Sequence, residues 1–210
     1  MTDRAGETDS ARSQGRRSFI AVALPAALRC ELFAAAAALA PPLPGVKWAL
    51  KVENLHLTLK FLGKVSDENL AKLAAALVEE LAAVPPFEVT VRGMGAFPRP
   101  SQANVIWAGV DDATGGLARV AELVETIGAR LQLGEKEARP YRAHITVGRA
   151  KPDRDVRAAL APWADRAFGT FTVATVQLYE SKLSPHGSTH LVLASARLGW
   201  PLSPPPLPAT

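Results

Sequence analysis

Two short segments of the chain share one pattern, in which a histidine is followed by an aliphatic residue, a threonine and a second aliphatic residue. Residues 56–59 read His-Leu-Thr-Leu, and residues 144–147 read His-Ile-Thr-Val. In an extended strand, side chains two residues apart leave the same face. Each segment therefore predicts a histidine beside a threonine on one face, with aliphatic side chains packed into the core behind them.

This arrangement suits acid and base catalysis at a phosphodiester. If the two strands face each other across a groove, a neutral imidazole can take a proton from water while the opposite imidazolium protonates the leaving oxygen. The hydroxyls of Thr58 and Thr146 can donate hydrogen bonds to the non-bridging oxygens, without any metal ion. One such segment is an ordinary surface pattern, but two in good strand context predict His56 and His144 as a catalytic pair. This reasoning leaves open which of them is the acid.

Three cationic side chains close to these segments are candidates for binding the phosphate. Lys60 shares the strand parity of His56, and Arg142 shares that of His144. Arg149 has the opposite parity from His144, so it reaches the phosphate only if Gly148 introduces a bulge or the strand has already ended. Two further histidines, at positions 186 and 190, lie in or near a Ser-Pro-His-Gly turn and are interpreted as exposed turn residues outside the site.

The hydrophobic pattern switches repeatedly between a period of two and a period of 3.6 residues, which indicates a mixed α+β fold. Each half of the chain contains strands, helices and one of the histidine segments, so we expect two similar lobes that face each other across a cleft. Helices are predicted at 26–39, 66–81, 116–131 and 154–163, and strands at 19–24, 47–51, 55–62, 87–91, 104–110, 144–147, 170–179 and 190–196.

Length and composition fit one two-lobed domain over residues 17–199, between a polar tail at 1–16 and a proline-rich tail at 200–210. The formal charge of +4 only weakly favours an anionic partner. Cys30 is the single cysteine, and no spacing of ligands resembles a metal site, so we expect no metal, no cofactor and a cytoplasmic location. The apolar run that ends at Pro41 is too short to span a bilayer, so no membrane partner is expected.

Longer runs around both histidine segments make the sequence similar to the two-histidine phosphoesterases. Within that group it resembles the RNA 2',3'-cyclic phosphodiesterases, also called 2'-5' RNA ligases. The resemblance is carried by residues 17–22, 54–63, 105–110 and 139–149.

This resemblance implies a bilobal antiparallel fold and hydrolysis of a terminal 2',3'-cyclic phosphate on RNA to a 2'-phosphate. It implies that His56 is the proton donor and His144 the proton acceptor, and that 2'-5' ligation is a reverse side activity. It also leads us to expect an aromatic residue at position 190, where this chain has histidine. We expect a monomer that acts on RNA ends such as tRNA fragments.

Three alternatives remain at this stage. The same two histidines would serve a cyclic phosphodiesterase that acts on a small nucleotide. The second alternative is a non-catalytic nucleotide-binding or RNA-binding module. It is disfavoured, because binding alone would not need two opposed proton carriers. A metal-dependent hydrolase is disfavoured, because the sequence has no clustered carboxylates or histidines at ligand spacing.

Overall fold

The computed structural model describes residues 15–49, 51–135, 139–185 and 187–199. The predicted tails lie outside these ranges, except that Gly15 is described and Arg16 begins the first strand. Among the helices in the described ranges, none is both long enough and apolar enough to cross a membrane.

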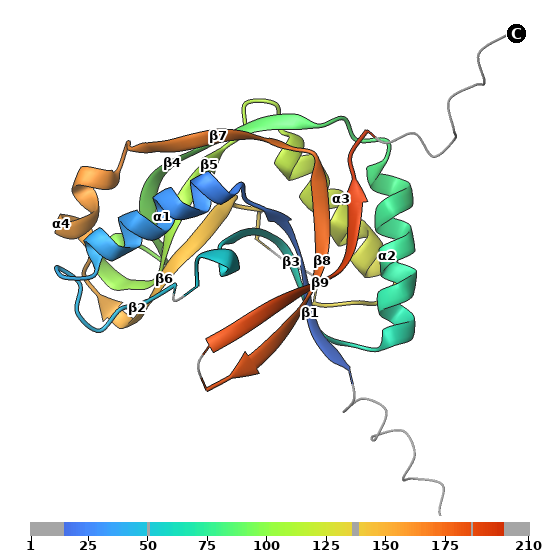
Figure 1. Ribbon diagram of the computed structural model, residues 1–210, viewed down its shortest axis with the longest axis horizontal. Helices are drawn as coiled ribbons and strands as arrows, with labels where there is room; N and C mark the ends of the chain where they lie inside the picture. Colours follow the sequence, from blue (N-terminus) through green and yellow to red (C-terminus); the bar gives the residue numbers. More distant parts are fainter. Residues whose placement is uncertain (1–14, 50, 136–138, 186, 200–210) are drawn as a thin grey trace, which may run out of the picture.

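Within the described residues, nine antiparallel strands form one strongly curled sheet (Figure 1). The order is β7-β4-β5-β6-β3-β1-β8-β9, with the short β2 paired to β6. The two halves of the sheet meet where β3 pairs with β6 through Leu57 and Ile145. The strands are β1 (Arg16–Ala23), β2 (Lys47–Trp48), β3 (His56–Val65), β4 (Phe87–Phe97), β5 (Ala103–Asp111), β6 (His144–Arg154), β7 (Ala167–Val173), β8 (Thr175–Ser184) and β9 (Gly187–Arg197).

The halves of this sheet form two lobes, as predicted, but they do not correspond to the two halves of the chain, because the first and last strands share one lobe. One lobe holds β1, β3, β8 and β9, and the other holds β2, β4, β5, β6 and β7. Four α-helices in the described residues cover them: α1 (Ala26–Leu39), α2 (Asp67–Leu81), α3 (Gly116–Arg130) and α4 (Arg157–Leu160). Short 3-10 helices lie at η2 (Val52–Asn54), η3 (Pro100–Gln102) and η4 (Ala161–Trp163).

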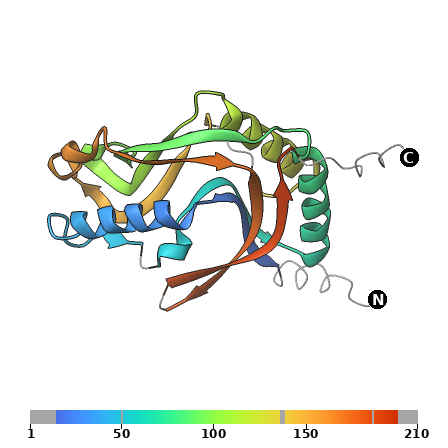
Figure 2. The same ribbon diagram turned by 45° about the horizontal axis from the view of Figure 1, so that its top comes forward.

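The two longest connections exchange helices between the lobes (Figures 1 and 2). Helix α1 joins β1 to β2 and β3, yet it packs on β6 and β7 of the other lobe. Helix α3 joins β5 to β6, yet it packs on α2 and β3. Each lobe therefore closes its core with a helix that starts from a strand of the other lobe.

Local sequence explains where most of these elements begin and end. Pro25 precedes α1, whose observed bounds are those predicted, and Ser66 caps α2 by accepting a hydrogen bond from the Asn69 amide. Gly63 was expected to end its strand, but β3 continues through it with a φ of +71°. The prediction of a single strand over 170–179 is wrong, because the strand is interrupted at Ala174 and forms β7 and β8.

Candidate active site

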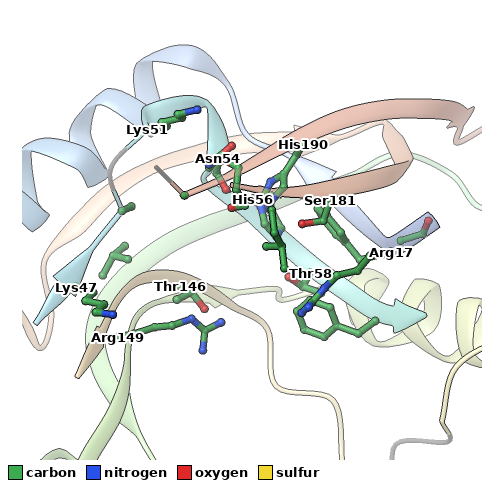
Figure 3. A pocket seen from close by; sticks show the side chains of 18 of the residues that line it. Arg17, Lys47, Lys51, Asn54, His56, Thr58, Thr146, Arg149, Ser181 and His190 are labelled. Atoms are coloured by element: carbon green, nitrogen blue, oxygen red, sulfur yellow. Dashed lines mark hydrogen bonds between the residues drawn. The ribbon is translucent and has the colours of Figure 1, made fainter. Parts of the chain in front are cut away.

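A cavity of about 810 Å³ opens where β3 and β6 diverge, and residues from both lobes line it (Figure 3). Three of the predicted catalytic side chains line this cavity, namely His56, Thr58 and Thr146. The cavity lining has no carboxylate among the residues that the structure describes. It has five cationic side chains: Arg17, Lys47, Lys51, Lys64 and Arg149. The cavity is therefore suited to an anion.

His56 is the first residue of β3, and its ring is fixed from two sides. Its Nδ1 lies 2.7 Å from the backbone carbonyl of Asn54, and its ring centroid is 4.7 Å from that of Phe19. Because a carbonyl only accepts hydrogen bonds, Nδ1 carries the proton and Nε2 remains the free acceptor of the neutral ring. The Asn54 side chain in turn donates to the carbonyl of Ser188 at 2.8 Å, which ties the start of β3 to the β8-β9 hairpin.

His144 is the first residue of β6, and its ring is fixed in the same way. Its Nδ1 lies 2.7 Å from the carbonyl of Arg142, two residues earlier, and its ring meets Phe97 edge-on at 5.0 Å between centroids. The lining of the cavity follows β6 from Thr146 to Arg149 and does not include His144 itself. Both histidines thus hold Nδ1 on a carbonyl and leave Nε2 for chemistry.

The pairing of β3 with β6 relates the two histidine segments to each other. If the antiparallel register at Leu57 and Ile145 is continued by one residue each way, each histidine lies opposite the threonine of the other strand. The two histidines are then diagonal neighbours, for which Cα separations of about 7–8 Å are usual. In that register, a local two-fold axis through the Leu57 and Ile145 pair would relate the two histidine and threonine pairs.

Burial controls the charge of His56. Removal from water lowers the pKa of this imidazole to about 4, although its hydrogen bond to the Asn54 carbonyl acts in the opposite direction. His190 also contributes by repelling a second positive charge, and burial lowers the pKa of His190 too. In the absence of an anion, His56 is therefore neutral near pH 7.

A β-bulge in β3 changes the direction in which the Lys60 side chain points. Ala21 and Ile20 of β1 pair with Thr58 and Lys60, so Leu59 is an extra residue in β3. Leu59 and Lys60 both point into the core, and the strand parity is inverted from there to Leu62, where a second register shift restores it. The prediction that Lys60 shares the face of His56 is wrong for this reason.

The ammonium of Lys60 is also fully occupied elsewhere. Its Nζ donates to both carboxylate oxygens of Glu125, at 2.9 and 2.8 Å, and to the carbonyl of Glu135 at 2.9 Å. The Lys60 side chain is 3% exposed, and Glu125 belongs to α3. Lys60 therefore links β3 to the helix behind it and does not line the cavity.

A second bulge has the opposite consequence for Arg149. Ile106 and Trp107 of β5 pair with Gly148 and Thr146, so Val147 is the extra residue in β6. The inverted parity brings Arg149 to the cavity face, as the sequence analysis required for this residue to reach the phosphate. Arg142 precedes β6 outside the cavity lining, and its guanidinium lies 5.2 Å from the centroid of the Phe97 ring.

His190 and Tyr141 are among the residues of the site that sequence reasoning missed. His190 was interpreted as lying outside the site, but on β9 it lines the cavity, and its ring centroid is 5.1 Å from that of His56. Tyr141 is partly buried between the lobes, and its hydroxyl donates to the carbonyl of Thr58 at 3.0 Å. Burial raises the pKa of Tyr141, so it remains a hydrogen-bond donor. The strand predicted over 190–196 was the available signal for His190.

A family model described as the 2'-5' RNA ligase superfamily matches residues 27–184. The chain belongs to this superfamily. Curated members similar to it are named RNA 2',3'-cyclic phosphodiesterase. The protein of Archaeoglobus fulgidus is 38% identical over 144 residues, which cover 68% of this chain and 78% of that one. The protein of Methanothermobacter thermautotrophicus is 30% identical over 186 residues, which cover 87% and 98%.

A solved structure of the superfamily has the same fold. Escherichia coli LigT complexed with 3'-AMP superposes with a TM-score of 0.74 at 28% identity, over 88% of this chain and 99% of LigT. Among the residues described here, no three His, Cys, Asp or Glu side chains gather as metal ligands would. The curled bilobal sheet is thus an architecture that this chain shares with LigT.

Proposed function

We propose that this protein hydrolyses the terminal 2',3'-cyclic phosphate of RNA to a 2'-phosphate, with His56 and His144 as the proton-transfer pair. One observation carries the proposal: both histidines hold Nδ1 on a backbone carbonyl and leave Nε2 free on paired strands. The names of the curated relatives and the LigT complex with 3'-AMP support the same reaction and a nucleotide substrate.

In the proposed reaction, a water oxygen attacks phosphorus and the bond from phosphorus to the ribose 3' oxygen breaks. His144 takes the proton of the water, and His56 gives a proton to the departing 3' oxygen. Thr58 and Thr146 donate hydrogen bonds to the non-bridging oxygens, while Arg149 offsets their negative charge. The histidines end with exchanged protons and return to their starting states through solvent. Ligation would be the same displacement with a ribose hydroxyl in place of water as the nucleophile, which leaves a 2'-linked diester and a free 3' hydroxyl.

The donor role of His56 requires its proton to arrive with the substrate. Burial lowers the pKa of His56 to about 4, so the ring is neutral near pH 7 while no anion is bound. A phosphodiester anion close to the ring favours the protonated form and raises this pKa. Substrate binding and protonation of His56 are therefore coupled in the proposed cycle.

The experiment uses an oligoribonucleotide that ends in a 2',3'-cyclic phosphate, incubated with the protein in excess EDTA. We expect a 2'-phosphate product, and we expect His56→Ala and His144→Ala each to lower kcat by roughly 10²–10⁴-fold. Thr172→Ala, at an exposed threonine of β7, is the control for Thr58→Ala and Thr146→Ala and should leave kcat unchanged. An intact cyclic end with the wild-type protein would refute the proposal.

A substrate with sulfur in place of the 3' oxygen separates the two histidine roles. A thiolate leaves without being protonated, so it does not need a general acid. Activity on this substrate should therefore be restored in His56→Ala and remain absent in His144→Ala. Rescue of His144→Ala instead would exchange the two roles and leave the reaction itself intact. We further propose a cytoplasmic monomer that acts on RNA ends such as tRNA fragments.

A further inference from the structure

The cavity continues past His56 along β1 and β3, where two cations face each other. Arg17 of β1 pairs across the strands with Lys64 of β3, and both line the cavity. Like charges placed directly opposite on antiparallel strands destabilise the pair. In the part of the chain that the structure describes, neither side chain has a hydrogen bond or an ion pair. Their mutual repulsion is therefore uncompensated in the protein alone.

The preceding residue shows that this lack of partners belongs to the cavity face. Arg16 points to the opposite face of β1, where its guanidinium lies 2.6 Å from Asp67 and 3.4 Å from Glu180. Two successive arginines therefore differ in one respect: the outer one meets two carboxylates, whereas the inner one meets a lysine. An anion from outside the protein would neutralise the inner pair.

An exposed aromatic ring lies between this pair and the catalytic histidine. The bulge at Leu59 turns Phe61 to the cavity, where it is 63% exposed. The ring centroid of Phe61 lies 6.2 Å from that of Phe19, and the ring of Phe19 in turn contacts His56. Aromatic side chains that alternate with cations along a groove are typical of surfaces that bind single-stranded nucleic acid, because bases stack and phosphates pair.

We propose that Phe61, Arg17 and Lys64 form a subsite for the nucleotide upstream of the reacting end. Phe61 stacks on the upstream base, and the two cations bind a phosphate of the chain that continues from it. This inference rests on the proposed function and specifies its substrate as an RNA chain rather than a mononucleotide. The opposite end of the cavity also carries cations, Lys47 and Lys51, but its aromatic residue, Trp48, is packed against Gly148.

The test compares kcat/KM for a mononucleoside 2',3'-cyclic phosphate with that for a tetranucleotide that ends in the same nucleotide. We expect the wild-type protein to prefer the tetranucleotide and Arg17→Gln/Lys64→Gln to lower this preference about tenfold. Phe61→Leu should lower it roughly fivefold or more. The slope of log kcat/KM against log salt for the tetranucleotide should become shallower by about 0.7 for each phosphate that the variant no longer binds.

Arg16→Gln is the matched control, because it removes the same charge one residue away on the opposite face. It should leave the preference close to the wild-type value. An unchanged preference in the double variant would overturn the proposal. A loss of preference in Lys47→Gln would also overturn it, because the RNA chain would then leave the cavity at the end that carries Lys47 and Lys51. An equal loss on both substrates would also overturn it, since the cations would then serve the reacting phosphate.

Failure of the proposed function gives a different result. The wild-type protein would then turn over neither substrate, and the subsite is tested by binding alone. The probe is a fluorescent tetranucleotide with a 2'-phosphate end, compared by anisotropy with the corresponding mononucleotide. A Kd ratio that falls in Arg17→Gln/Lys64→Gln and not in Arg16→Gln upholds the subsite, and equal ratios in both reject it.

Discussion

The low pKa of His56 makes the stability of this protein sensitive to mild acid. In the unfolded chain the imidazole titrates with a pKa of about 6.5, whereas burial holds the pKa in the folded protein at about 4. Between these values the unfolded chain binds more protons than the folded one, so the free energy of unfolding falls as the pH is lowered. This loss begins near pH 6.5 and ends near pH 4.

The size of the effect follows from the two pKa values. Between pH 7 and pH 5, linkage of this one group lowers the free energy of unfolding by about 2 kcal/mol. His56→Gln replaces the imidazole by an amide, which can still donate a hydrogen bond but does not titrate. The variant should therefore lack this part of the acid sensitivity. Glutamate and aspartate side chains titrate mostly below this range, and they are common to both proteins.

Urea unfolding of the wild-type protein and of His56→Gln at pH 7 and pH 5 measures the difference directly. The wild-type protein should lose about 2 kcal/mol more than the variant on acidification, with equal m values. Equal losses would mean that the ring accepts a proton freely in the folded protein. The donor role would then not depend on the substrate, and the coupling of binding to protonation would be refuted. Inorganic phosphate should raise the pKa of His56 in an NMR titration.

Two further predictions concern the side chains that hold the site together. Glu125→Gln leaves the ammonium of Lys60 buried without a counter-charge and should lower the free energy of unfolding by about 3 kcal/mol in chemical denaturation. Lys60→Met should cost less, because the carboxylate that it leaves unpaired is 30% exposed. The reverse order of the two losses would contradict this account. Gly148→Ala would bring a methyl carbon within 2.9 Å of the Trp48 ring. This overpacking should lower stability by roughly 1–3 kcal/mol, which a lower Tm would show and an unchanged Tm would contradict.

The placement of each histidine beside its threonine on a strand could be predicted from sequence because its signal is local. A histidine and a threonine two residues apart share a strand face whatever the strand pairs with, and the aliphatic residues between them report which face is buried. The same holds for α1, whose flanking prolines fix both ends. These features depend on a few neighbouring residues, so a single sequence contains them.

The side chains beyond each threonine could not be predicted in the same way. Parity placed Lys60 in the site and Arg149 outside it, and the two bulges reverse both assignments. Each bulge arises from the register with a neighbouring strand, β1 in one lobe and β5 in the other, which lies far away in the sequence. The same limit applies to His190, because its place beside His56 depends on how the β8-β9 hairpin folds back over the cavity.

The exchange of helices between the lobes limits how the protein can move and unfold. A hinge motion that separated the lobes would expose the apolar side chains of α1, such as Leu28 and Leu32, and uncover β3 beneath α3. Such exposure costs about 25 cal/mol for each Å². Each lobe completes its core with a helix that starts from a strand of the other lobe, so we expect that the lobes do not fold independently. Heat or denaturant should therefore melt them in one cooperative transition.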